Sequence, residues 1–251
     1  MINFPYIITP SSSVLKIVPW STGTDEEIAA MITAADQGKI NLTKCWSVGD
    51  ERVVHLSAMS ANSNGVFTSP QAEQDVVWRL ANEGYSGVDN ESINFVWVQK
   101  DCLSLKAGIN PTNTIAGSWG GCALRTDLNN LYYNAIPQTL RNSLKTFKTY
   151  YADDSNNTLV AVSDKIAIFA EKEIFGSMSW GSNAEESLER ITDFKYTDAL
   201  EKHDAEGNLI SWWTRTWYGY AGTDYIEVLT NKNSAPGNAS TKLGIAPFGC
   251  I

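Results

Sequence analysis

Few residues in this sequence are of the types that carry out acid–base or nucleophilic chemistry. The chain has 251 residues but only two histidines, His55 and His203, and neither stands in a nucleophile-like motif. A catalytic triad therefore has no candidate. The stretch VVHL alternates in the manner of a half-buried strand, so we expect His55 to lie on one face of a strand. We predict no catalytic residue and no enzymatic activity.

The cysteines do not form a metal-binding or redox pattern. Cys45, Cys102, Cys122 and Cys250 lie far apart in the chain, and no C-x-x-C pair occurs. With two histidines there is no zinc pattern, and we predict neither a metal nor a cofactor. The even number allows two disulfides. We favour free buried thiols, because cysteine is a small side chain that packs well in a core.

Acidic and glycine-rich stretches give weak signals. The acidic pairs at 153–154 and 185–186 lie in polar stretches, and we expect them to be solvated; no feature marks either as a glycosidase pair. The stretch GSWGG at 117–121 lacks the Lys-Ser/Thr ending of a phosphate-binding loop. Asp224 and Glu227 could contact a polar ligand or calcium, although two carboxylates alone are slight evidence.

The strongest feature is aromatic. Residues 211–230 read SWWTRTWYGYAGTDYIEVLT, in a chain that has nine tryptophans and ten tyrosines. Large aromatic side chains either fill the core of a β-rich fold or provide contact area to a partner. The sequence leaves both uses open for this segment.

Composition excludes several classes of partner. The net charge is −9, the sequence pI is about 4.7, and the chain has no cluster of Lys and Arg. We therefore expect neither nucleic-acid binding nor attraction to an anionic membrane surface. The amino terminus lacks a basic region before its apolar residues, and no apolar run reaches membrane-spanning length, so we expect synthesis in a cytoplasm without membrane insertion.

The helices and strands that position these residues are predicted from the spacing of apolar residues and from the places of Gly, Pro and helix-capping residues. Residues 1–23 are rich in Pro and Ser and predict an extended arm. Thr24 or Asp25 can cap a helix over 24–38, which Gly38 ends. Further elements are expected as strands within 45–59, 75–80 and 93–103, a helix over 122–133 with a second from Pro137, a strand and helical turn within 162–176, a charged surface helix and loop over 182–210, and short strands from 211 onward. The sum is an α+β fold.

Several separated blocks resemble a family of uncharacterised proteins that is common in phages and prophages of gut bacteria. The blocks are DEEIAAMI, WSVGD, INPTNTIAGSWGGCALRTDLN, GCALRTDLNNLYYNAIPQTLR, SWWTRTWYGY and the ending LGIAPFGCI. The resemblance runs from about residue 24 to the carboxyl terminus. It is weakest over 60–92 and absent from the first twenty residues. We therefore expect an arm over 1–23 and a single domain over 24–251, with 60–92 as a divergent insertion.

The resemblance implies a C-type-lectin-like fold with short strands and long loops, shared with formylglycine-generating enzymes and with phage tropism determinants. In tropism determinants, a diversity-generating retroelement alters residues on a ligand-facing surface near the carboxyl terminus. Here TWYGYAGTDYIEVLT departs from the family's Asn- and Tyr-rich run at that place. The enzyme branch of the fold needs a redox-active cysteine or a copper-binding pair, and Cys122 and Cys250 do not form one, so we expect no such activity.

One hypothesis is a virion-associated protein that attaches to a host receptor or glycan, as a tail fibre does. Trp212, Trp213 and Arg215 would then belong to the buried frame, with the change from core to surface near Thr216. Trp212 and Trp213 should be buried, whereas Tyr220 and Tyr225 should be exposed. The predicted ligand-binding residues are Trp217, Tyr218, Tyr220, Asp224, Tyr225, Asn231 and Asn233.

The alternative hypothesis is a structural virion protein, such as a capsid decoration protein, head fibre or baseplate component. The long arm favours it, because an extended segment can add a strand to a neighbouring subunit. Packing of the arm on its own domain is the simpler possibility. Both hypotheses predict other virion proteins as partners, a homo-oligomer and a location in the virion. A third reading is an enzyme whose chemistry the sequence does not reveal.

Overall fold

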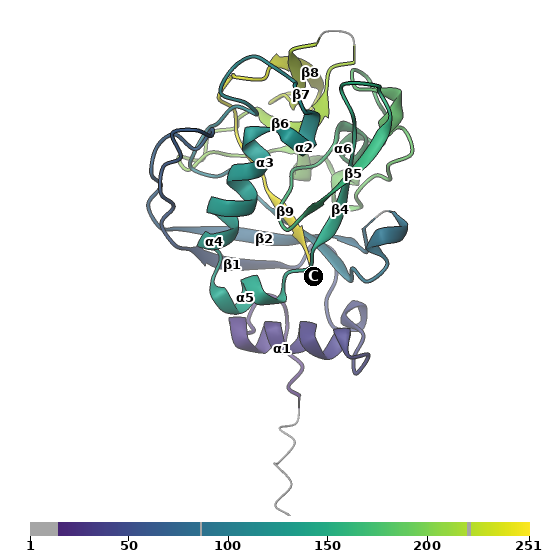
Figure 1. The fold of residues 1–251 in the computed structure, drawn as a ribbon. Coiled ribbons are helices and arrows are strands. Elements are labelled where there is room, and N and C mark those ends of the chain that lie inside the picture. The colour runs from purple at the N-terminus through teal and green to yellow at the C-terminus, as the bar shows by residue number, and fades with distance from the viewer. Residues whose placement is uncertain (1–14, 86, 220–221) are drawn as a thin grey trace, which may run out of the picture.

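The computed structural model describes residues 15–85, 87–219 and 222–251. These residues form a mixed helix and sheet fold, which confirms the predicted α+β class. Helix α1 (Asp25–Asp36) lies at one end of the molecule. The carboxyl-terminal sheet of β6 (Trp212–Trp217), β7 (Asp224–Val228) and β8 (Ser234–Asn238) lies at the other (Figure 1). No helix in the described part of the chain is long and apolar enough to cross a bilayer.

Helix α1 (Asp25–Asp36) forms where the sequence predicts it. Thr24 accepts a hydrogen bond from the backbone N–H of Glu27, and Glu27 accepts one from the backbone N–H of Thr24. This reciprocal cap satisfies two N–H groups that a helix start otherwise leaves unpaired. The apolar face of α1 is buried and packs against α5 (Gln138–Ser143).

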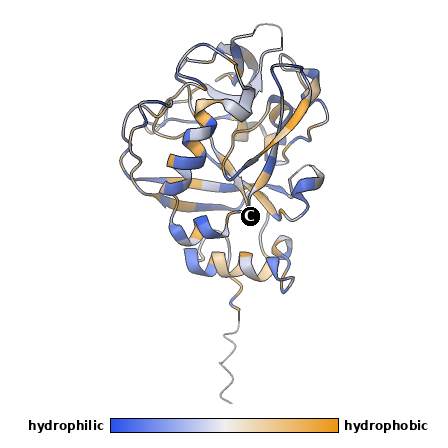
Figure 2. Cartoon of the chain, in the orientation of Figure 1, coloured by the Kyte–Doolittle hydropathy of each residue, from blue (hydrophilic) through white to orange (hydrophobic). Residues whose placement is uncertain are grey.

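A four-stranded antiparallel sheet forms the centre of the fold. Its order is β1 (Glu51–Leu56), β2 (Gln74–Glu83), β3 (Phe95–Gln99) and β9 (Phe248–Cys250). Hydrophobic stretches follow the strands at the centre of the molecule, whereas much of α5 is hydrophilic (Figure 2). Strand β2 belongs to the segment 60–92, so this segment supplies the strand that lies between β1 and β3.

Side chains of the edge strand β1 alternate between buried and exposed as expected, whereas those of the inner strand β3 do not alternate. In β1, Val53 and His55 are exposed while Val54 and Leu56 are buried, as predicted. All five residues of β3 are buried, because other elements cover both of its faces. Strand β9 pairs with β3, with Val96 opposite Cys250. The carboxyl terminus is thereby held in the core.

The expected helix over 122–133 is confirmed as a helical segment over 123–135 that contains a π-helical turn. It comprises α3 (Ala123–Asp127), the π-helical turn (Leu128–Tyr132) and α4 (Tyr133–Ala135), and the short α2 (Ser118–Gly121) precedes it. The N-cap of α5 is Pro137, in agreement with the predicted start of a second helix.

Two smaller sheets complete the fold. Strands β4 (Phe147–Ala152) and β5 (Leu159–Asp164) form a hairpin. The helical turn predicted after β5 is α6 (Glu171–Phe175). The third sheet has the order β6 (Trp212–Trp217), β7 (Asp224–Val228), β8 (Ser234–Asn238).

The predicted charged surface helix over 182–210 is wrong. The segment contains three short 3₁₀ turns, Asn183–Glu185, Asp193–Lys195 and Thr197–Leu200. Glu185 and Asp193 are buried. Glu185 accepts a hydrogen bond from the backbone N–H of Ala152, and Asp193 pairs with Arg79. These partners come from distant strands, so the local charge pattern did not reveal them.

The described part of the arm packs on its own domain. Val18 and Trp20 are buried. The indole N–H of Trp46 donates to the carbonyl oxygen of Val18 over 2.9 Å, and the ring of Trp46 lies 5.2 Å from that of Trp20. Residues 1–14 lie outside the described part of the chain.

Candidate functional site

The residues predicted to form a buried frame do so. Trp212 and Trp213 are fully buried, and their indole N–H groups donate to the carbonyl oxygens of Leu200 (3.2 Å) and Ala107 (3.0 Å). Large aromatic rings with satisfied N–H groups are stable core elements. The expectation for this pair is therefore confirmed.

Arg215 anchors the same strand from within the core. Its guanidinium makes two hydrogen bonds to the carboxylate of Glu173, at 2.6 and 2.8 Å, and both side chains are fully buried. Glu173 also accepts a hydrogen bond from the hydroxyl of Tyr85 (2.7 Å). A buried charge pair needs such complete hydrogen bonding to offset its loss of hydration.

The prediction that Tyr225 is exposed is wrong, and Trp217 is also buried. Tyr225 is 0% exposed and Trp217 is 8% exposed. The two residues pair directly across β6 and β7, and the indole N–H of Trp217 donates to the carbonyl oxygen of Ala152 (2.9 Å). Other elements cover both faces of this strand pair. Neither side chain can serve as a ligand platform, and the core continues to Trp217 rather than ending near Thr216.

Of the other predicted ligand-binding residues, the structure brings Tyr218 and Asp224 together, because the backbone N–H of Tyr218 donates to the carbonyl oxygen of Asp224 over 2.9 Å. Both are half-buried, whereas Asn231 and Asn233 are exposed in the turn between β7 and β8, at the other end of β7. The side chain of Asn231 accepts a hydrogen bond from the backbone N–H of Asn233 and so stabilises its own turn. Tyr220 lies outside the described residues.

The surface beyond Trp217 joins Tyr218 to a tryptophan that the sequence analysis did not single out. Trp180 is 38% exposed, and its ring lies 6.1 Å from that of Tyr218 in an edge-to-face arrangement. A backbone bridge between Gly181 and Tyr218 ties the two segments together. Trp180 and Tyr218 are called the aromatic pair below.

A buried carboxylate holds the loop that carries Trp180. Glu171 accepts hydrogen bonds from the backbone N–H groups of Ser179, Trp180 and Gly181, and from the hydroxyl of Ser234. The indole N–H of Trp180 donates to the carbonyl oxygen of Ser234 (2.9 Å). Four of these hydrogen bonds involve the loop itself, so the exposed ring has little conformational freedom to lose on binding.

A small polar hollow of about 110 Å³ lies on the same loop. Its walls are Asn157, Gly181, Ser182, Asn183 and Gly219. Asn157 accepts a hydrogen bond from the hydroxyl of Ser182. No charged side chain lines the hollow among the residues described. Amide, hydroxyl and backbone groups of this kind suit a neutral ligand with several hydroxyl groups.

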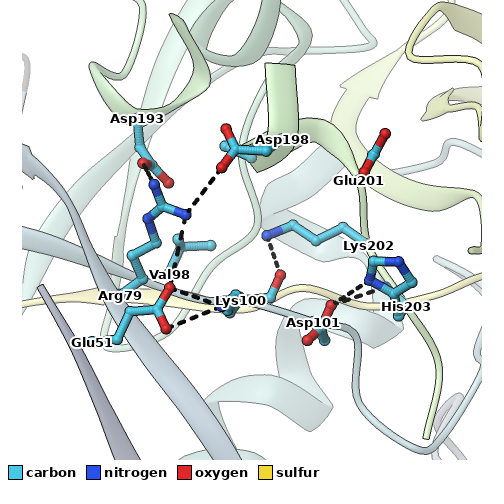
Figure 3. A pocket seen from close by; sticks show the side chains of 11 residues that line it. Glu51, Arg79, Val98, Lys100, Asp101, Asp193, Asp198, Glu201, Lys202 and His203 are labelled. Atoms are coloured by element: carbon cyan, nitrogen blue, oxygen red, sulfur yellow. Dashed lines mark hydrogen bonds and ion pairs between the residues drawn. The ribbon is translucent and has the colours of Figure 1, made fainter. Parts of the chain in front are cut away.

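A larger pocket of about 340 Å³ lies between the central sheet and the segment 193–203 (Figure 3). Charged side chains dominate its walls. They are Glu51, Arg79, Lys100, Asp101, Asp193, Asp198, Glu201, Lys202 and His203. This second site is called the charged pocket below.

Two cationic groups define the inner part of the charged pocket. Arg79 pairs with Asp193 at 2.9 Å, and its contacts with Glu51 and Asp198 are longer, at 3.8 and 3.9 Å. Lys202 is 2% exposed. Burial lowers the pKa of its ammonium group to about 8.

The described residues offer no cluster of metal ligands, and burial disfavours ionisation of the Cys102 and Cys122 thiols. The described part of the chain contains no group of three or more His, Cys, Asp or Glu side chains that could hold a metal ion. All four cysteines are free, and burial raises the pKa of Cys102 and of Cys122 to about 12. Thiols of this kind are poor nucleophiles at neutral pH.

The two sites differ in how far the sequence could have revealed them. Trp180 stands in the stretch SMSWGSN, whose Gly, Ser and Asn residues are typical of an exposed turn. That signal was available for Trp180. The charged pocket combines residues from β1, β2, β3 and the turns of 193–203, and no local pattern connects them.

No curated protein and no solved structure matches the chain. Residues 95–251 match the family described as Domain of unknown function (DUF6273). The match begins at the first residue of β3 and ends with the last residue of the chain. Because it covers more than half of the chain, the protein belongs to the DUF6273 family.

Proposed function

We propose that this protein is a virion-associated binding protein that attaches to a host-surface glycan through the aromatic pair and the adjacent polar hollow. The observation that carries the proposal is the exposed Trp180, held in place by Glu171 beside a hollow lined by amides and a hydroxyl. Aromatic faces pack on the apolar faces of sugar rings, while amide groups bind the hydroxyls.

The proposal includes a C-type-lectin-like domain whose carboxyl-terminal surface is diversified between copies of the gene. Short strands joined by long loops support it, as do the buried Trp212, Trp213 and Arg215 of β6, the strand that leads to Tyr218. Comparison of gene copies tests this part. Substitutions should fall on the half-buried Tyr218 and on exposed positions such as Asn231 and Asn233, and should spare the buried Trp217 and Tyr225. An even spread over buried and exposed positions would count against it.

Binding is tested on a glycan array with the full chain and two variants, Trp180→Ala and Tyr218→Ala. Each variant should bind a retained glycan on the order of tenfold more weakly, the effect of removing an aromatic anchor from a binding site. Tyr196→Ala is the matched control, because Tyr196 is an aromatic residue that is 60% exposed outside this surface. The proposal fails if no glycan is retained, or if Trp180→Ala binds as the unchanged protein does.

A structural role in the virion is the second candidate, and one feature of the sheet favours it. Strand β1 lies at an edge of the four-stranded sheet and carries Val53, which is exposed. An unpaired edge can accept a strand from a neighbouring subunit. Deletion of residues 1–14 tests the arm without removing the buried Val18 and Trp20. Oligomer formation and virion incorporation should be lost if the arm serves assembly.

A further inference from the structure

We infer that the charged pocket is a binding site for a small zwitterion of the amino-acid type. Its carboxylate would lie between Arg79 and Lys202, and its ammonium group would contact Asp198. The volume of about 340 Å³ suits a ligand of this size. The inference stands on residues remote from the aromatic pair and is independent of the proposed glycan binding.

The inner part of the pocket is suited to a carboxylate. Figure 3 shows the ammonium group of Lys202 and the guanidinium of Arg79 pointing toward each other across the pocket. Lys202 donates to the carbonyl oxygens of Gln99 (3.1 Å) and Lys100 (2.7 Å). An ammonium group has three donors, so these two carbonyl oxygens leave one of them. The nitrogen also lies 5.6 Å from the ring centroid of Trp212 and 6.0 Å from that of Phe194, and a ligand oxygen would add to these contacts.

Asp193 balances part of the positive charge that Arg79 and Lys202 bring to this space, and a ligand carboxylate would balance more of it. Burial is the largest cause of the lowered pKa of Lys202; the carboxylates of Asp193 and Asp101 raise this pKa, and the positive charge of Arg79 lowers it further. The guanidinium of Arg79 has one contact of hydrogen-bond length, to Asp193. Its other amino group lies 3.8 Å from Glu51 and 3.9 Å from Asp198, so it can still donate to a ligand carboxylate.

The outer part of the pocket is suited to an ammonium group. Asp198 has a 70% exposed side chain and contacts Arg79 only at 3.9 Å. The neighbouring carboxylates are more fully engaged, because Glu201 pairs with Lys232 at 2.7 Å and Asp101 contacts His203 at 3.0 Å. Asp198 is therefore the carboxylate best placed to bind a new cation.

The arrangement of charges favours a zwitterion over a simple ion. Five carboxylates line the pocket against three Lys and Arg side chains, so its mouth disfavours a ligand that is only anionic. Its inner cations disfavour a ligand that is only cationic. A molecule with both groups places each charge beside its opposite.

Calorimetric titration of the full chain with three probes tests the inference. The first probe, γ-aminobutyrate, carries both a carboxylate and an ammonium group. Butyrate carries only the carboxylate, and butylamine carries only the ammonium group. We expect γ-aminobutyrate to bind roughly fivefold more tightly than either single ion, the upper range for an exposed ion pair. Equal or tighter binding of butyrate or butylamine would overturn the zwitterion assignment, as would no binding of γ-aminobutyrate.

Substitutions then locate the two ends of the ligand. Asp198→Asn should weaken γ-aminobutyrate binding roughly threefold to fivefold and should not weaken butyrate binding. Glu91→Gln is the matched control, an exposed carboxylate outside the pocket. Lys202→Met should weaken binding of both γ-aminobutyrate and butyrate. Should Lys202→Met not fold, the Asp198→Asn titration decides alone, and unchanged γ-aminobutyrate binding by that variant would overturn the inference.

Discussion

Charged residues near the aromatic pair have complete hydrogen bonding, whereas charged residues around the charged pocket do not. Beneath the aromatic surface, Glu171, Glu173 and Arg215 are fully buried, and each makes several hydrogen bonds to the backbone or to a side chain. Around the charged pocket, Arg79 pairs closely with Asp193 at 2.9 Å, but its contact with Asp198 is 3.9 Å long and both side chains line an open volume. A buried charge with complete hydrogen bonding holds a surface in shape. A charge with incomplete bonding at a cavity wall remains available to a ligand.

The comparison predicts the largest loss of stability for the buried ion pair. Arg215→Met would leave the carboxylate of Glu173 buried without its cation. The expected cost is about 3–5 kcal/mol in the free energy of unfolding. Urea denaturation measures it, and the double variant Arg215→Met/Glu173→Met should recover part of the loss. A cost below about 1 kcal/mol would contradict a structural role for the pair.

In the charged pocket, the stability contributed by Lys202 should depend on pH. Its pKa is about 8 in the folded protein and 10.5 ordinarily, so between these values the unfolded chain binds more protons. Stability should therefore rise with pH in this window, by about 2 kcal/mol between pH 7.5 and 10. The measurement is the free energy of unfolding at each pH, and the contribution of Lys202 is the difference between the unchanged protein and Lys202→Met.

An exposed lysine provides the control for that measurement. Lys39→Met removes a positive charge far from the pocket in the sequence, at an exposed position. Its stability should follow that of the unchanged protein across the same pH range. Parallel curves for Lys202→Met and the unchanged protein would show that burial of Lys202 has no such effect.

A smaller effect is expected for the carboxylate under the aromatic pair. Glu171→Gln keeps the size of the side chain but replaces one accepting oxygen by an amide group that donates. We expect a loss of about 1–3 kcal/mol and weaker ligand binding, because the loop over 179–181 loses its acceptor. Glu186→Gln, an exposed carboxylate, is the control in denaturation and binding assays. Equal stability of the two variants would show that the hydrogen bonds of Glu171 do not stabilise the loop over 179–181.

The smallest loss of stability is expected at the surface itself. Trp180→Ala removes one hydrogen bond and one ring contact from a partly exposed side chain. Its cost should be about 1 kcal/mol or less, while ligand binding falls. A larger loss, measured by thermal denaturation against Tyr196→Ala, would assign Trp180 to the core rather than to a binding surface.

Local patterns were sufficient where partners are close in the chain. The cap of α1 joins residues three positions apart, so Thr24 and Glu27 predict the start of the helix. The alternation in β1 correctly places His55 on one face of a strand, and the structure shows that this face is exposed. Local patterns failed for Tyr225, which looked like part of a loop yet pairs with Trp217 inside a covered sheet. They also failed over 182–210, where buried carboxylates find partners on β2 and β4.

The sequence by itself determined the α+β class, α1 and the early strands. These follow from periodicity and capping, which act over a few residues. The burial of Trp212 and Trp213 was expected from the family resemblance, because their residue types alone left core and surface open. Only the tertiary structure decided where core gives way to surface after Trp217, that Trp180 lies beside Tyr218, and that Arg79 faces Lys202. Those relations join residues 38 to 123 positions apart, and packing of distant strands and loops brings them together.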